Sequence, residues 1–136
     1  MSNWQGLKVL VVDDSPTIRR AAASWLSKDR EGQPSGIVLD CQGSAKEAIQ
    51  AMEKFQPDIV FTDVQMPGHI DGYTLCKAMK RNGRHKEVKV IIMTAKNGLI
   101  DKAKAVDAGA DDFIEKPFKT PELCAMLDRY APNRSA

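Results

Sequence analysis

Five short apolar runs alternate with five segments of helical periodicity along this chain of 136 residues. The apolar runs carry Val, Ile and Leu at consecutive positions, which is typical of strands that are buried on both faces of a parallel sheet. This alternation predicts a doubly wound α/β domain with right-handed crossovers. The strands are expected at residues 7–12, 37–41, 58–63, 88–93 and 112–114.

Most of the predicted helices begin at a recognisable start signal. Ser15-Pro16 supplies an N-cap and a proline at the first helical position, and Thr120-Pro121 repeats this arrangement near the end of the chain. Ser44 and Glu47 have the spacing of a capping box, and Asp71-Gly72 begins the third helix. The apolar positions of the second and fourth helices are Ala48, Ile49, Met52 and Phe55, and Leu99, Ile100, Ala103 and Val106.

The order of these elements predicts a flavodoxin-like (βα)5 sandwich with the parallel strand order 2-1-3-4-5. One domain is expected over residues 1–136, with its core at about 7–130 and a short polar tail at 131–136. In this order the first and third strands are neighbours at the switch point of the sheet. Ligands of open α/β sheets bind at this point, beyond the carboxyl ends of the strands.

Composition argues against several classes of protein. A formal net charge of +2 without a basic, aromatic-rich stripe disfavours direct binding to nucleic acid. Cys41, Cys76 and Cys124 are odd in number and lack C-x-x-C spacing, so we interpret them as buried, reduced thiols. The chain begins without a signal-peptide pattern, and no apolar run approaches about 18 residues. We therefore expect a cytoplasmic protein without membrane insertion.

Polar residues end four of the predicted strands. Asp13-Asp14 follows the first strand and Asp63 closes the third, while Thr94 and Lys116 follow the fourth and fifth. Each has a simpler explanation when taken alone: Asp63 as a turn residue, Asp13-Asp14 as a helix cap, and Lys116 as a surface-loop lysine. The parallel sheet nevertheless brings all of these strand ends to one edge, and this convergence favours a functional site.

Three close carboxylates indicate a bound cation. Carboxylates roughly 5 Å apart repel one another by about 3 kcal/mol per pair at an effective dielectric of about 20. Acid oxygens together with water suit Mg²⁺. A carboxylate beside Mg²⁺ is also a possible nucleophile that forms an acyl phosphate, and Lys116 is placed to offset charge on the transferring phosphoryl group.

An ordered set of motifs carries a family resemblance. The set consists of Asp13-Asp14, Asp63, Met66-Pro67, Asp71-Gly72, Thr94-Ala95 and Lys116-Pro117-Phe118. It resembles the receiver domain of two-component response regulators over about residues 7–130. The resemblance implies that a histidine kinase phosphorylates Asp63 in a reaction that depends on Mg²⁺.

The resemblance also implies a role for each residue of the site. Asp14, Asp63 and the backbone carbonyl of Gln65 are implied to bind Mg²⁺ directly, and Asp13 is implied to bind it through water. Lys116 is implied to contact the phosphoryl group.

Thr94 and Phe113 match the switch pair of the family. A phosphoryl group adds strong acceptor oxygens, so the Thr94 hydroxyl gains a partner and Phe113 can fill the space it leaves. The plainer interpretation is that Phe113 is a core aromatic and Thr94 a strand end, and both interpretations can hold together. We expect the helix at 99–106, the strand at 112–114 and the helix from residue 120 to form a face that shifts and controls a downstream protein partner.

One loop departs from the family pattern. Gly68-His69-Ile70 is one residue longer than the usual spacing, and His69 and His85 are interpreted as exposed loop histidines. The resemblance implies that Gln65 and Lys96 tune dephosphorylation.

Three functional classes follow from these residues. A phosphoacceptor switch is favoured, an inert receiver-like binding module is the alternative, and a Mg²⁺-dependent aspartyl phosphatase is disfavoured by Gln65, where such an enzyme typically needs a second acid. We expect no enzyme activity beyond phosphorylation and dephosphorylation of the protein itself. The stretches 17–20 and 98–104 are similar to single-domain receivers of chemosensory pathways that govern twitching motility, and we interpret Lys102 and Lys104 as solvated surface charges.

Overall fold

The computed structural model shows one parallel sheet between two layers of helices. It describes residues 4–66, 68, 70–81, 83, 87–94, 99–116 and 120–131, with the backbone alone at 99–101. The strands are β1 (Lys8–Val12), β2 (Val38–Gln42), β3 (Ile59–Asp63), β4 (Lys89–Thr94) and β5 (Asp112–Glu115). The helices are α1 (Pro16–Leu26), α2 (Ala45–Phe55), α3 (Gly72–Arg81), α4 (Leu99–Asp107) and α5 (Thr120–Tyr130).

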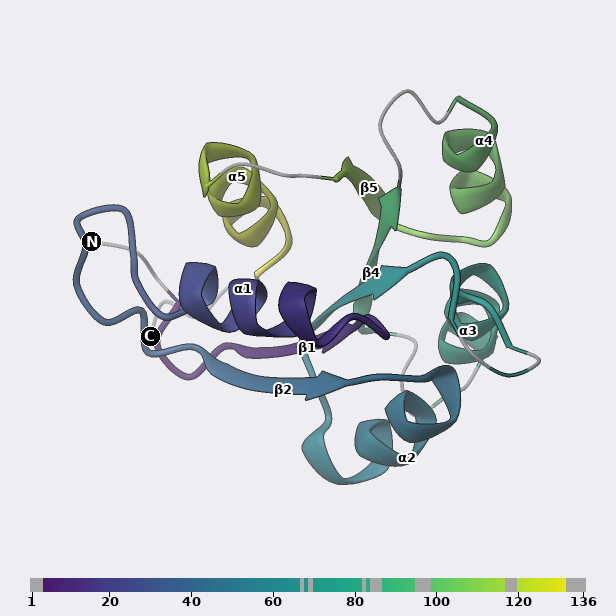
Figure 1. Cartoon of the computed structure of the whole chain (residues 1–136), viewed down its shortest axis with the longest axis horizontal. Coiled ribbons are helices and arrows are strands. Elements are labelled where there is room, and N and C mark those ends of the chain that lie inside the picture. The colour runs from purple at the N-terminus through teal and green to yellow at the C-terminus, as the bar shows by residue number, and fades with distance from the viewer. Residues whose placement is uncertain are drawn as a thin grey trace.

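The strands follow the order β2-β1-β3-β4-β5, and the pairings between neighbours are parallel. This confirms the predicted flavodoxin-like topology, and the strand bounds lie within one residue of those expected. α1 and α5 cover one face of the sheet, and α2, α3 and α4 cover the other (Figure 1). Because β1 and β3 are neighbours, with Val12 paired to Thr62, their carboxyl ends lie together.

The sheet divides the core into two apolar layers. Val9 and Val11 of β1 belong to the layer beneath α1 and α5, whereas Leu10 and Val12 belong to the layer on the opposite face. All four side chains are buried. Successive side chains of a strand point to opposite faces, so a strand between two helical layers needs apolar residues at every position. This is why the strands appear in the sequence as continuous apolar runs.

Helices α1 and α2 begin where the predicted caps place them, whereas α5 begins one residue earlier than predicted. The Ser15 hydroxyl accepts a hydrogen bond from the Ile18 amide at 3.3 Å, and Pro16 follows as the first residue of α1. The Ser44 hydroxyl accepts from the Glu47 amide at 3.2 Å and donates to the Glu47 carboxylate at 3.0 Å. The Glu47 carboxylate therefore accepts a hydrogen bond from the Ser44 hydroxyl, whereas in the usual capping box it accepts one from the amide of the cap residue.

Two of the predicted apolar faces differ from the structure. Ile49 of α2 is 40% exposed and Val106 of α4 is 70% exposed, and Ala103 is exposed as well. Ala105 of α4 and Ala108, just after the helix, are buried instead. Because small side chains allow the helix backbone to lie close to the sheet, α4 turns an alanine stripe inward and leaves Val106 in solvent.

Several residues singled out in the sequence lie outside the described part of the chain. They are Pro67, His69, His85, Ala95, Lys96, Pro117 and Phe118, together with the side chains of Leu99 and Ile100.

Candidate functional site

The carboxyl ends of β1 and β3 bring three acids together. Asp13 and Asp14 directly follow β1, and Asp63 is the last residue of β3. Each of them offers one carboxylate oxygen to a cluster in which the three atoms lie within 4.8 Å of one another. The predicted convergence of these side chains is therefore present in the structure.

Lys116 connects two of these acids. Its ammonium Nζ lies 2.8 Å from Asp13 Oδ2 and 2.8 Å from Asp63 Oδ1. The Lys116 amide also donates a hydrogen bond to the Thr94 carbonyl at 2.7 Å, which continues the β4–β5 pairing past the end of β5. Lys116 is thus held in the site by its backbone as well as by its side chain, and it is not the isolated surface lysine of the simpler interpretation.

Asp13 is the most enclosed of the three acids. It is 1% exposed, and its Oδ1 atom accepts a hydrogen bond from the Ser15 amide at 2.9 Å. The Asp13 carbonyl accepts a second hydrogen bond, from Arg19 Nη1 at 2.7 Å. The turn after β1 is therefore fixed from α1. The cap of α1 is Ser15, and Asp13 instead accepts from the Ser15 amide within the preceding turn, so the capping interpretation of Asp13 was wrong.

Asp63 is positioned by a close contact with the start of α3. The Gly72 amide donates to the Val64 carbonyl at 2.8 Å, and a Cβ atom added to Gly72 would lie 2.0 Å from the Asp63 carbonyl oxygen. Only glycine leaves room for this approach without a shift of the backbone. The Asp71-Gly72 pair marked the helix start in the sequence, but the requirement for space at Asp63 is visible only in the structure.

The charges in the site act on one another. Burial raises the pKa of the Asp63 carboxyl, the Asp13 carboxylate raises it further, and the hydrogen bond from Lys116 only partly offsets these effects. Burial alone would lower the pKa of Lys116, but the hydrogen bonds to Asp13 and Asp63 outweigh it and raise that pKa. One ammonium beside three carboxylates leaves excess negative charge, which favours binding of a cation.

Asp14 and Gln65 lie at the solvent side of the site, where both residues are exposed. Among the described residues, Asp14 has no hydrogen bond or ion pair to occupy its carboxylate. Hard oxygen donors, excess negative charge and an accessible carboxylate are the features that Mg²⁺ needs, because it binds one or two carboxylates and keeps several waters. The residues present therefore fit Mg²⁺.

Thr94 and Phe113 occupy different environments. Thr94 is 1% exposed, and its hydroxyl donates a long hydrogen bond of 3.5 Å to the Ile114 carbonyl. Phe113 is half-buried against the core layer on the α2, α3 and α4 side. The Thr94 position is one residue beyond Met93, the residue paired with Asp63 across β3 and β4. The predicted switch threonine is thus next to the acidic site, while the aromatic side chain is near α4.

Lys102 is a residue whose contacts the sequence did not reveal. Its ammonium lies 3.0 Å from Glu115 Oε1 and 5.2 Å from the centroid of the Phe113 ring. The interpretation of Lys102 as a solvated charge was therefore wrong, since it joins α4 to β5. The lysine spacing along α4 gave no sign of this, because the partners come from another element.

An open parallel sheet with acids at the ends of β1 and β3 and a lysine after β5 is the arrangement of a receiver domain. The sequence matches the response regulator receiver domain family over residues 9–128. The chain belongs to this family and is a receiver domain of the kind found in two-component systems.

The chain is similar to named proteins of bacterial signalling. Protein PilG from Pseudomonas aeruginosa is 37% identical over 128 residues, a match that covers 94% of this chain and 90% of that protein. Other curated relatives are longer, and the chain spans 55% of their length.

Solved structures of receivers are similar over most of the chain. The chemotaxis response regulator CheY4 of Vibrio cholerae has a TM-score of 0.75 and 26% identity, and the match covers 93% of this chain and 98% of that one. The receiver domain of the sensor histidine kinase PA1611 from P. aeruginosa has a TM-score of 0.78 and 26% identity, covering 92% and 97%. That structure has a magnesium ion coordinated in its active site cleft.

Among the residues that the structure describes, no helix has the length and apolar character needed to cross a membrane.

Proposed function

We propose that this chain is a phosphoacceptor switch in which Asp63 receives a phosphoryl group from a histidine kinase. The observation that supports this most directly is the contact between Lys116 Nζ and both Asp13 and Asp63, at 2.8 Å each, inside a cluster of three carboxylates. A nucleophilic carboxylate, a fixed ammonium and further acidic ligands are the groups that phosphoryl transfer to an aspartate requires.

In the proposed reaction, a carboxylate oxygen of Asp63 attacks the phosphorus of a phosphohistidine. A P–O bond forms as the P–N bond breaks, and the imidazole nitrogen that leaves takes a proton from solvent. Lys116 supplies a compact positive charge beside the attacking oxygen, and this charge stabilises the phosphoryl oxygens during transfer. Asp13 holds the other side of Lys116 and so keeps its ammonium in place.

Mg²⁺ is the cofactor that we propose for this site. The groups that would hold it are the carboxylates of Asp14 and Asp63 and the carbonyl of Gln65, with Asp13 acting through water. When bound, the ion offsets negative charge on the transferring phosphoryl group. The magnesium ion in the PA1611 receiver domain supports this assignment, since that domain has the same fold.

We propose that the signal leaves the protein through the face formed by α4, β5 and α5. Phosphorylation draws the Thr94 hydroxyl toward Asp63 and allows Phe113 to move into the space it leaves. A groove of about 320 Å³ on this face is lined by Phe113, Ile114, Glu115, Glu122, Ala125 and Met126. Together with the exposed side chain of Val106, it offers an apolar surface to a downstream protein.

This proposal includes no turnover of a separate substrate. An aspartyl phosphatase typically needs a second acid two residues beyond its nucleophile, where this chain has the exposed Gln65. The similarity to PilG and CheY4 supports a chemosensory or motility pathway, and we propose a cytoplasmic location as for other receivers. Hydrolysis of an added phosphate ester at a steady rate would contradict the proposal that the chain turns over no separate substrate.

The proposed function is tested by intact-mass measurement after incubation with acetyl phosphate, with and without Mg²⁺. We expect the wild type to gain one phosphoryl group only when Mg²⁺ is present, and Asp63→Asn to gain none. Asp107→Asn is the matched control, because it removes an exposed acid of α4 at a distance from the acidic cluster. A gain that persists in Asp63→Asn would assign the phosphoryl group to another residue.

A further inference from the structure

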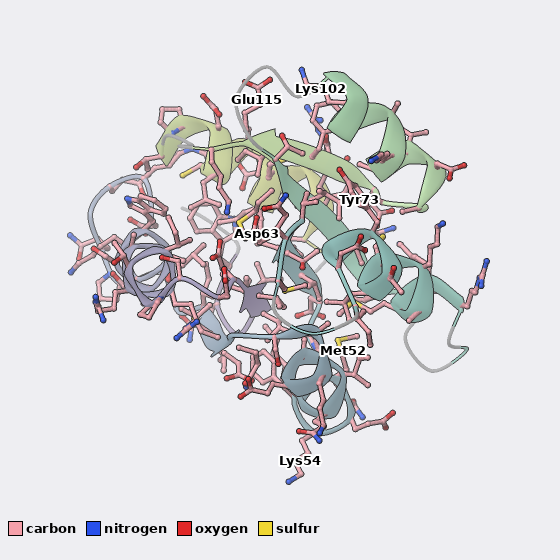
Figure 2. The ribbon with its side chains drawn as sticks, turned by 45° about the vertical axis from the view of Figure 1, so that its right-hand side comes forward. Met52, Lys54, Asp63, Tyr73, Lys102 and Glu115 are labelled. Carbon is pink, nitrogen blue, oxygen red and sulfur yellow. The ribbon has the colours of Figure 1, made fainter. Side chains whose placement is uncertain are left out.

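The ammonium of Lys102 in α4 contacts two side chains of β5. It forms an ion pair with Glu115, with Nζ and Oε1 3.0 Å apart, and it lies 5.2 Å from the centroid of the Phe113 ring. Figure 2 shows Lys102 and Glu115 close together at the top of the view. Phe113 and Glu115 are two positions apart, so both side chains leave β5 on the same face, toward α4.

The end of β5 is therefore held from two sides. Glu115 is bound by Lys102, and the next residue, Lys116, is bound by Asp13 and Asp63. A change of charge at Asp63 acts on Lys116 first, and one peptide unit separates Lys116 from the residue that is attached to α4. The contact between α4 and β5 thus lies directly beside the site.

The packing of α4 makes this contact important for the position of the helix. Of its side chains that the structure describes, only Ala105 is buried, while Ala103, Lys104 and Val106 are exposed. An alanine contributes little apolar area, so among the described side chains of α4 the polar contacts at the edges of the helix contribute to its position. Lys102 makes them on the β5 side, and Lys104 lies 5.9 Å from the ring centroid of Tyr73 on the α3 side.

We propose that Lys102 is a positioning residue of the switch, which holds Phe113 and α4 in the unphosphorylated arrangement. This inference rests on the proposed function, because it assigns a role to Lys102 in the response to a phosphoryl group at Asp63. If Phe113 moves toward Thr94, its ring leaves the ammonium, and the cation–π contact is lost. Lys102 therefore opposes the transition, and its removal favours the phosphorylated arrangement.

The test compares Lys102→Met with Lys104→Met, which removes the lysine on the other side of the same helix. Both are probed with Mg²⁺ and beryllofluoride, a small mimic of the phosphoryl group, and the position of the Phe113 amide resonance is followed by NMR. We expect Lys102→Met to bind beryllofluoride about three- to tenfold more tightly than wild type, because a ligand binds more tightly when its preferred state is more populated. The Phe113 resonance of the free variant should also lie closer to its beryllofluoride-bound position.

Two further variants separate positioning from general stability. Glu115→Gln removes the ion pair and keeps the aromatic contact, so we expect an effect between wild type and Lys102→Met. Lys102→Arg keeps both kinds of contact and should restore the wild-type affinity. A loss of a purely structural contact would lower the melting temperature without moving the Phe113 resonance toward the bound position.

The outcomes distinguish this inference from the proposed function. An unchanged or weaker affinity in Lys102→Met, or an equal gain in Lys104→Met, would overturn the role of Lys102 while leaving phosphorylation of Asp63 intact. Beryllofluoride binding that is absent in wild type, or kept in Asp63→Asn, would instead overturn the proposed function.

Discussion

Lys116 and Asp63 form an ion pair across the end of the sheet, with Nζ and Oδ1 2.8 Å apart. The same ammonium is bound to Asp13 at 2.8 Å. Lys116 therefore occupies two of the three acids that a metal ion would use. This double contact predicts that the lysine and Mg²⁺ compete for carboxylates even though both assist phosphoryl transfer.

Replacement of Lys116 by Met should separate these two effects. We expect tighter Mg²⁺ binding, because Asp13 and Asp63 lose their competing cation, and phosphorylation by acetyl phosphate about 10- to 100-fold slower, because a charge that stabilises transfer is lost. Calorimetric titration measures the first and intact mass against time the second. Lys54→Met is the control, since Lys54 projects from α2 far from Asp63 (Figure 2). Weaker Mg²⁺ binding in Lys116→Met would show that the lysine organises the acids instead of competing for them.

Asp14 should contribute to metal binding and not to the stability of the fold. Its exposed carboxylate has no hydrogen bond or ion pair among the described residues, and it adds repulsion to a cluster within 4.8 Å. Without Mg²⁺, we expect the free energy of unfolding of Asp14→Asn to lie within about 1 kcal/mol of the wild-type value or slightly above it. Added Mg²⁺ should raise the melting temperature of wild type but not of the variant. An equal rise in both proteins would place the ion elsewhere.

Gly72 should tolerate no side chain. An added Cβ would lie 2.0 Å from the Asp63 carbonyl oxygen, so Gly72→Ala must displace either the start of α3 or the end of β3. We expect a loss of about 1–3 kcal/mol in the free energy of unfolding, as for other strained insertions into packed regions, together with slower phosphorylation. Gly83→Ala is the matched control, because no atom of the described residues lies within 4 Å of a Cβ placed there. Urea unfolding of both variants measures the difference, and equal stabilities would contradict the predicted clash.

Arg19 should differ from its neighbour Arg20. Arg19 Nη1 donates to the Asp13 carbonyl at 2.7 Å, whereas Arg20 is exposed. We expect Arg19→Ala to lower the free energy of unfolding by about 1–2 kcal/mol, because a charge-assisted hydrogen bond is lost, and to weaken Mg²⁺ binding at the loosened turn. Arg20→Ala should leave both quantities unchanged. Identical behaviour of the two variants would mean that Ser15 alone holds the turn.

Titration of the Cys76 thiol should lower the stability of the protein at alkaline pH. Burial raises the pKa of this thiol to about 11, from 9.0 for an ordinary cysteine. Between these pH values the unfolded chain has released the proton and the folded chain still holds it. The unfolded state then binds fewer protons, so stability falls as pH rises, by about 2–3 kcal/mol across this window.

Urea unfolding at pH 8 and pH 10.5 should therefore show a smaller alkaline loss in Cys76→Ala than in wild type. The variant itself should be less stable at both pH values, because it leaves a cavity among buried residues. Burial also raises the pKa of Tyr130, and the ion pairs of Lys116 raise its pKa, so part of the alkaline loss should remain. An alkaline loss of the same size in both proteins would show that Cys76 does not titrate in this range.

The fold could be predicted because its determinants are local. Buried strands give continuous apolar runs, helix starts carry Ser and Pro, and the alternation of the two leaves few topologies. The convergence of Asp13, Asp63 and Lys116 followed from this, since parallel strands end at one edge. The face of α4 could not be predicted, because its alternation of Ala, Lys and Val fits more than one orientation and the sheet decides which stripe lies inward.

The contacts that the sequence did not reveal all join different elements. Lys102 meets Glu115 and Phe113 across the gap between α4 and β5, and Gly72 meets Asp63 across a loop. Such contacts depend on how far side chains reach between elements, which no spacing along a single helix encodes. The predicted roles of Gln65, Thr94 and Phe113 stay predictions, since they concern states that follow phosphorylation.

The hydrogen bond from the Gly72 amide to the Val64 carbonyl, at 2.8 Å, ties together the two ends of the segment that contains the extra residue. Length added between such anchors is absorbed within the segment and is not transmitted to β3. Insertions and deletions between residues 65 and 71 are therefore expected to leave Asp63 in its place at the end of β3.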